Sequence, residues 1–314
     1  DKGAGAGGSI WITCDVLKGS TNGLIRANGG TSGGVGSAGG GGRIAVIYDT
    51  GSQVSAGNPG VRMQAAGGSV GYRPGEDGTV YLPDKQFLSA TMDKQLFRNV
   101  KLFIPGFTNW SMQSLTLNNC SFAFGESNFV LVVTNNIALN NGGLGINGNF
   151  RLHCGGQISM TNASSLYLYS GPTNGANPSY GGLLAVTGMI DTASGSWIYP
   201  YSDENNGGSV KIKCGELRVA SGGGINADKK GYTIYQGPGT GANGGSYGGG
   251  AGHGGYGAMH TGGNLRGNVY GSVSLPVAPG SGGGEANLGG HGGGLIWIDT
   301  PTGIVYVAGT LSAD

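Results

Sequence analysis

The chain has 314 residues, of which 71 are glycine, and charged residues make up only 11%. Its formal net charge of +1 and scattered Lys and Arg exclude the basic patch typical of nucleic-acid-binding or membrane-surface proteins. No apolar run approaches the roughly 18–20 residues of a membrane span. Because 38% of the residues are hydrophobic and cluster in short runs, the composition indicates an ordered protein rather than a flexible linker.

The chain opens with two short strand-like runs joined by a turn, and this pattern returns later. Residues 7–28 read GGSIWITCDVLKGSTNGLIRAN. The stretches 207–228 and 293–314 fit the same template, and each copy closes with Ala followed by Asn or Asp. Such a strand pair is too short to bury its own apolar face, so copies must stack on neighbouring coils, as in a solenoid.

Apolar and polar residues alternate within each copy of the template. Ile10, Ile12 and Cys14 share one side of the first run, while Trp11 lies on the other. Cys154 and Cys214 occupy the position of Cys14 in later copies. The four cysteines have no metal-ligand spacing, and we expect them to behave as small apolar residues inside the stack.

The middle of the chain consists of further strand-like runs at intervals of roughly 20–30 residues, which is the length of one coil of a parallel β-helix. Only residues 93–101 (DKQLFRNVK) carry a helical signal. We expect an all-β parallel β-helix or β-solenoid with packed polyglycine-II-type helices in its glycine-rich excursions. The expected regions, which form one continuous unit, are a glycine-rich β-repeat region at 1–83, β-helix coils at 84–228, and a glycine-rich excursion returning to a strand pair at 229–314.

Glycine tracts separate the strand pairs, at 31–42 and, much enlarged, at 237–294. A flexible linker would not carry Tyr, His, Leu and Pro at intervals within the glycine. Extended glycine helices with three residues per turn have no internal hydrogen bonds, so their backbones must pair with one another. We therefore expect the 237–294 tract to be ordered, packed, and the part that contacts a neighbouring subunit.

Several motifs resemble the glycine-rich β-strand repeats of large bacterial and plant surface or wall-associated proteins. They include GLIRANGG (23–30), GGGGRIAVIY (39–48) and VAGTLSAD (307–314). The tracts are also similar to the glycine-rich extracellular domain of the anaplastic-lymphoma and leukocyte receptor tyrosine kinases, and to polyglycine-helix tips of phage adhesins. The resemblance covers both ends, roughly half the chain, and implies an extracellular or cell-surface scaffold. It does not imply kinase activity, because no kinase signature is present.

Catalytic signatures are missing from the sequence, and we expect a non-enzymatic protein without metal or cofactor. Glycine-rich strings that mimic nucleotide-binding motifs are inevitable at this composition and lack a βαβ context. A weaker alternative is a β-helix polysaccharide lyase, which would need clustered carboxylates. The candidate residues on adjacent coils are Asp191, Asp203, Glu204 and Lys211, for which solvated turn positions are the simpler interpretation.

The favoured function is a structural subunit or repeat of a surface filament that assembles head to tail. The chain ends on GTLSAD, which a glycine tract and a strand follow in other copies, and residues 1–12 would supply that continuation. Truncation of a longer protein explains the same observation equally well. The expected subunit joint comprises Asp1, Lys2, Gly3, Ala313 and Asp314.

An adhesin that binds surface glycans is the alternative function. Its recognition loop would be 256–268, with Tyr256, His260, Asn264 and Arg266. Three sequons, at Asn109, Asn119 and Asn162, are candidate glycosylation sites in a secretory route. The expected partners are further copies of the chain or surface glycans, and neither nucleic acid nor a membrane span is expected.

Overall fold

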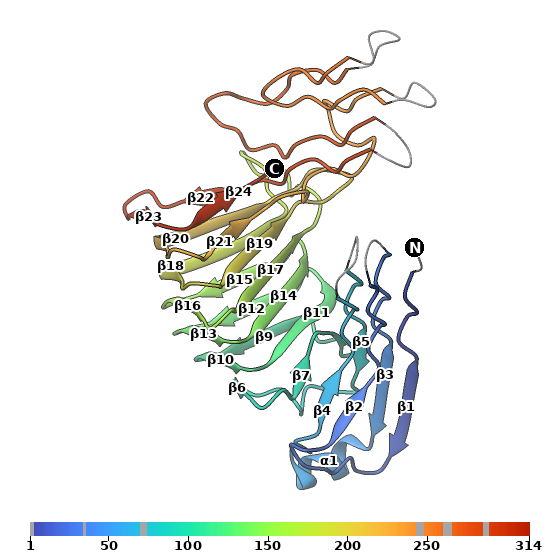
Figure 1. The fold of residues 1–314 in the computed structure, drawn as a ribbon. Coiled ribbons are helices and arrows are strands. Elements are labelled where there is room, and N and C mark those ends of the chain that lie inside the picture. The colour runs from blue at the N-terminus through green and yellow to red at the C-terminus, as the bar shows by residue number, and fades with distance from the viewer. Residues whose placement is uncertain (1–2, 34–35, 70–73, 243–247, 260–265, 285–288) are drawn as a thin grey trace.

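The computed structural model describes residues 3–33, 36–69, 74–242, 248–259, 266–284 and 289–314. Within them the chain winds into a parallel β-solenoid, with strands stacked as the rungs of a ladder (Figure 1). Glycine-rich segments extend from both ends of this stack. The expectation of a parallel β-helix or β-solenoid is confirmed.

Sheet A runs the length of the solenoid. Its neighbouring strands are all parallel, and the order along the sheet follows the order along the chain. The strands are β1 (Ser9–Cys14), β3 (Arg43–Tyr48), β5 (Thr79–Tyr81), β8 (Val100–Phe103), β11 (Ser121–Ser127), β14 (Gly143–Gly148), β17 (Ser165–Ser170), β19 (Trp197–Tyr201), β21 (Gly224–Asn226) and β24 (Thr310–Ser312).

Sheet C forms two further ladders, which meet in β18 (Gly182–Thr192) and β20 (Val210–Val219). These two long strands cross from one ladder to the other through a register shift between Val186 and Met189. The first ladder contains β9 (Asn109–Met112), β12 (Val130–Val133), β15 (Arg151–Cys154) and β22 (Trp297–Asp299). The second contains β6 (Thr91–Met92), β10 (Leu115–Asn118), β13 (Ile137–Asn140), β16 (Ile158–Thr161) and β23 (Val305–Val307).

A short sheet B joins β2 (Leu24–Arg26), β4 (Arg62–Gln64) and β7 (Phe97–Arg98) beside the N-terminal coils. The prediction of a helical turn at 93–101 is wrong, because this segment contains β7 and the start of β8 (Val100–Phe103). In the described part of the chain, the α-helix is instead α1 (Thr50–Ala56), where the Asp49 side chain accepts a hydrogen bond from the N–H of Ser52. That N-cap satisfies a donor that the helix leaves unpaired.

The core fills the solenoid with one layer of apolar side chains for each coil. In the second ladder of sheet C, Leu117, Leu139 and Met160 lie in register and are buried. Phe124 and Phe129 stack with their ring centroids 3.9 Å apart. The expected alternation is confirmed, since Ile10, Ile12 and Cys14 pack on the core whereas Trp11 is 76% exposed. All four cysteines are free thiols, and three are buried.

Asparagines occupy the corner that leads into sheet A. Asn99, Asn119, Asn141 and Asn162 all have positive φ, a left-handed conformation that Asn adopts more readily than other non-glycine residues. The Asn141 amide donates to Oδ1 of Asn119 at 2.7 Å, and the Asn162 amide donates to Oδ1 of Asn140 at 2.6 Å. The corner thus turns the chain and links consecutive coils.

Replacing Asn141 separates these two contributions. Asn141→Gly keeps the left-handed backbone and loses the side-chain bond, so we expect the free energy of unfolding to fall by about 1 kcal/mol. Asn141→Ala also strains the backbone, and the loss should reach about 2 kcal/mol. Urea unfolding measures both, and equal losses would contradict a conformational role for this corner.

The three template copies do not occupy equivalent faces of the solenoid. In 207–228 and 293–314 the first strand lies in sheet C and the second in sheet A. In 7–28 the first strand, β1, lies in sheet A and the second, β2, in sheet B. Cys154 and Cys214 therefore share a row through Val186, while Cys14 lies on another face.

The glycine segments carry no strands in their described parts but bond laterally, backbone to backbone. Near the N-terminus, the N–H of Gly30 donates to Gly5, that of Gly39 to Gly30, and that of Gly68 to Gly39, at 2.8–2.9 Å. The C-terminal excursion repeats this, for example from Gly252 to Gly239 and from Gly280 to Gly293. A Cβ on Gly39 would overlap the carbonyl of Gly5, so the contact excludes any side chain.

A matched pair of variants tests this packing. Gly39→Ala places a methyl group against a neighbouring backbone, and we expect a loss of about 1–3 kcal/mol in stability. Gly5→Ala is the control, because a Cβ at that exposed position meets no atom within 4 Å. Denaturant unfolding should separate the two variants, and amide exchange should show lost protection of Gly30 and Gly68 in Gly39→Ala alone.

Both ends of the solenoid present strand edges without a neighbour among the described residues. At the N-terminal end these are β1 and β2, and at the C-terminal end β22, β23 and β24. The last coil exposes apolar side chains, including Ile304 at 66% and Val305 at 44%. Among the described residues, no helix has both the length and the apolar character needed to cross a membrane.

Candidate functional site

The outward side of sheet A carries a hollow two strands wide. Its floor is made by β11 and β14, whose outward residues here are small. One row in register runs Lys101, Ala123, Gly145, Tyr167, and a neighbouring row runs Ser121, Gly143, Ser165. Because strands lie about 4.8 Å apart, the small residues open a gap of about 14 Å between the Lys101 and Tyr167 positions.

Tyr167, Tyr169 and Tyr201 line one wall of this hollow, and Tyr199 packs against Tyr167 without lining it. Tyr167 stacks on Tyr199 at 4.9 Å and Tyr169 stacks on Tyr201 at 4.5 Å, between ring centroids. Lys230 closes the far end of the ladder, with its ammonium 5.4 Å from the ring of Tyr199 and 5.1 Å from that of Tyr201. Burial raises the pKa of Tyr201 to about 12 and also raises that of Tyr169, so both phenols stay neutral at physiological pH.

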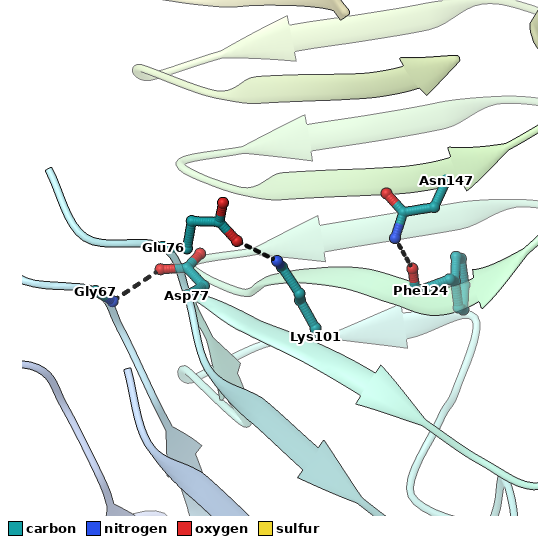
Figure 2. Close-up of polar contacts among 6 residues, drawn as sticks. All are labelled: Gly67, Glu76, Asp77, Lys101, Phe124 and Asn147. Atoms are coloured by element: carbon teal, nitrogen blue, oxygen red, sulfur yellow. Dashed lines mark hydrogen bonds and ion pairs between the residues drawn. The ribbon is translucent and has the colours of Figure 1, made fainter. Parts of the chain in front are cut away.

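The opposite wall comes from the glycine segment that precedes β5. Figure 2 shows Glu76 reaching toward Lys101 and Asp77 directed at the backbone of Gly67. The Lys101–Glu76 ion pair measures 2.8 Å, and the N–H of Gly67 donates to Oδ1 of Asp77 at 3.1 Å. The Lys101 side chain therefore contacts the glycine segment at Glu76, and the Asp77 carboxylate links that segment to Gly67.

The groove, as we call this hollow, has a volume of about 790 Å³. Its charged lining residues are Glu76, Asp77, Arg98 and Lys101, two of each sign. Asn147 contributes an amide whose Nδ2 donates to the carbonyl of Phe124 at 2.6 Å, which fixes the amide's orientation (Figure 2). The groove thus combines aromatic rings, oriented amides and balanced charge.

The pKa values of the two acidic side chains of the groove are shifted in opposite directions. Burial raises the pKa of Asp77, against the opposing hydrogen bond from Gly67 and the charge of Lys101. The hydrogen bond and charge of Lys101 lower the pKa of Glu76. The folded state therefore binds the Asp77 proton more tightly than the unfolded chain does, and the Glu76 proton less tightly.

This difference predicts opposite pH dependences for two variants. As pH rises from about 3 to about 6, ionisation of Asp77 costs stability, so Asp77→Asn should become more stable relative to the wild type. Ionisation of Glu76 adds stability over the same range, so Glu76→Gln should become less stable relative to the wild type. Urea unfolding at several pH values measures both, and slopes of the same sign would contradict the assignment.

The groove was not predicted, because its residues come from strands of different coils. Of the predicted joint, Asp1 and Lys2 lie outside the described residues, Gly3 is exposed at one end, and Ala313 and Asp314 lie at the other. The N–H of Asp314 donates to the Asp228 carboxylate at 2.9 Å. The structure therefore brings the two halves of the joint to opposite ends of one molecule.

The predicted recognition loop is only partly described. His260 and Asn264 lie outside the described residues. The guanidinium of Arg266 sits 4.3 Å from the ring centroid of Tyr256, which is 62% exposed. These two residues are brought together on the C-terminal excursion, away from the residues that line the groove.

The three sequon asparagines differ in environment. Asn109 is exposed on β9, whereas the side chains of Asn119 and Asn162 bond to neighbouring coils at the corner. An N-linked glycan is attached to Nδ2, which is the donor atom at Asn162, whereas Asn119 takes part in its bond through Oδ1. Of the three, Asn109 is the one whose side chain does not take part in a bond between coils, and the use of these sequons stays a prediction.

The residues weighed for lyase chemistry do not line the groove. Lys211 pairs with Asp299 at 2.9 Å, and the Asp203 carboxylate accepts the N–H groups of Asn205 and Asn206 in its own turn. The described residues include no cluster of three His, Cys, Asp or Glu side chains able to hold a metal ion.

The fold defines the chain as a parallel β-solenoid with glycine-rich excursions. Comparison with protein-family models, with curated proteins and with solved structures found no match to it.

Proposed function

We propose that this chain is a structural segment of an extracellular fibre, in which the last coil of one copy pairs with the first coil of the next. The role is mechanical rather than catalytic. The observation that carries the proposal is a set of backbone hydrogen bonds that recurs from coil to coil, and the strands at both ends have no such partner among the described residues.

The first recurring bond joins the glycine before a strand to the alanine that closes the preceding coil. The N–H donors are Gly42, Gly78 and Gly294, and the carbonyl acceptors are, in the same order, Ala27, Ala65 and Ala227, at distances of 2.6–2.7 Å. Gly8 and Ala313 hold the equivalent template positions at the two ends of the chain. In a stacked pair, Gly8 of one copy would donate to Ala313 of the other.

A second recurring bond runs in the other direction along the stack. The N–H of Ala27 donates to the carbonyl of Gln64, and that of Ala227 donates to Ser312. By template position, the N–H of Ala313 would donate to Arg26 of the next copy. A third series, from Arg43 to Gly8 and from Thr79 to Gly42, would continue from Ser9 of the next copy to Gly294.

This pairing fixes the geometry of the joint. In the joint, β1 and β2 of one copy would continue β22 and β24 of the other. β22 and β24 belong to sheets C and A, whereas β1 and β2 belong to sheets A and B of their own copy. Consecutive copies are therefore rotated about the solenoid axis rather than simply translated. A head-to-tail contact with such a rotation builds an open helical filament.

Glycine segments form part of the same fibre. We assign them the polyglycine-II conformation, which is extended, lacks internal hydrogen bonds and allows each helix to bond to its neighbours. Their lateral bonds and the overlap that any Cβ would cause at Gly39 support this assignment. Bundled glycine helices would stiffen the fibre and shield its backbone from proteases.

Proline substitutions at the two open edges test the fibre. Ser9→Pro and Ala313→Pro each remove an N–H that would donate to the adjoining copy in the proposed joint, and proline at a strand edge also blocks the approach of another strand. The chain should form filaments visible by negative-stain electron microscopy, and the double variant should remain a folded monomer by circular dichroism and sedimentation.

The matched control is Ser9→Thr with Ala313→Ser, which keeps both N–H groups and should assemble like the wild type. Filaments of the proline variant with unchanged length would refute the pairing. A wild-type chain that stays monomeric at every concentration would refute assembly into a fibre.

A further inference from the structure

We propose that the groove binds an extended, uncharged glycan, with one sugar ring stacked on the open face of Tyr167. This site goes beyond the fibre role, since its residues lie on the side of the solenoid and not at its ends. The proposal rests on the tyrosine ladder, the small floor beside it, and the balance of charge.

The tyrosine ladder stops at Tyr167 although the sheet continues. Tyr199 covers one face of the Tyr167 ring. On the other side, the residue in register with Tyr167 is Gly145, which has no side chain. The next residue in the row, Ala123, is also small. The open ring face therefore borders a space in which another flat ring would extend the stack.

The floor beside Tyr167 carries small polar groups rather than apolar bulk. Ser121, Ser165 and backbone amides of glycine line it, with Asn147 at one end. Figure 2 shows the Asn147 amide oxygen directed away from the carbonyl of Phe124, to which its nitrogen is bound. Hydroxyl, amide and carboxylate groups around an aromatic face suit a ligand that has both C–H faces and many hydroxyls.

Charge narrows the ligand class further. The formal charges of the four charged lining residues sum to zero, and Lys101 is already paired with Glu76. A nucleic acid strand or a polyanionic polysaccharide needs a surplus of Lys and Arg along its track. A neutral chain of β-1,4-linked pyranoses has flat C–H faces and equatorial hydroxyls, which match an aromatic wall with polar edges.

Isothermal titration calorimetry with soluble hexamers of β-1,4-linked glucose and of β-1,4-linked N-acetylglucosamine tests the site. At least one hexamer should bind with one-site stoichiometry. Tyr167→Ala should weaken it about tenfold or more, as expected for a central aromatic contact. The matched control is Tyr199→Ala, which removes a ring from the same ladder but does not line the groove, and it should change binding less than about threefold.

A second variant tests the groove without disturbing the stacked tyrosines. Ala123→Leu fills the floor from the outward face, leaves the tyrosines in place, and should abolish binding. Absence of binding of both hexamers at millimolar concentration would overturn the proposal. So would equal loss in both tyrosine variants, or tighter binding of a polygalacturonate or oligonucleotide hexamer.

Glycan binding can be tested separately from filament formation. The Ser9→Pro and Ala313→Pro double variant leaves every lining residue of the groove unchanged, so it should bind the glycan with the wild-type affinity as a monomer. Loss of binding in that monomer would place the ligand at the joint between copies and refute the groove as the site.

Discussion

The backbone hydrogen bond between consecutive coils is the constraint on which this structure depends. Every coil must place its N–H and C=O groups opposite those of the coil before and after it, at the spacing of a β-sheet. Because an unpaired buried backbone group is costly, this requirement holds in the glycine segments as well as in the strands. The same donor–acceptor series therefore runs through both, as in the bond from Gly42 to Ala27.

Side-chain choice follows from where each residue lies on the coil. Inside the solenoid, stacked apolar side chains such as Leu117 and Leu139 fill the core. At the corner, Asn141 adopts a left-handed backbone, and its side chain donates a hydrogen bond to Asn119 in the preceding coil. In the glycine segments one backbone packs directly on another, so no side chain fits at Gly39. The large share of glycine is thus a consequence of backbone packing, not of flexibility.

Electrostatics contributes little to this architecture. Among the described residues the two ion pairs are Lys101–Glu76 and Lys211–Asp299, and Glu76 is well exposed. Exposed pairs of this kind are worth at most about 1 kcal/mol. Backbone bonds such as that from the N–H of Lys101 to Gly78 join the glycine segment to sheet A, and the Lys101–Glu76 pair adds a side-chain contact at one wall of the groove. The other wall needs no charge, since the tyrosines are held by stacking.

Sequence periodicity was enough to predict the class of fold, because alternation within a strand is a local property. The alternation at Ile10, Trp11 and Ile12 predicted the inward and outward sides of β1 correctly. The segment 93–101 failed for the opposite reason. Its apolar residues are too few to distinguish one helical turn from two short strands, and only pairing with β4 and β11 decides between them.

The sequence by itself determined that strand pairs would stack, that glycine tracts would interrupt them, and that the end copies would share one template. These are properties of short stretches of chain. Tertiary structure alone decided that β1 and β22 lie on different sheets and that Gly145 lies beside Tyr167. Register between coils sets such neighbours, and it depends on corners and long strands that no single template copy contains. The repeated strand pairs were therefore visible in the sequence, whereas the groove was not.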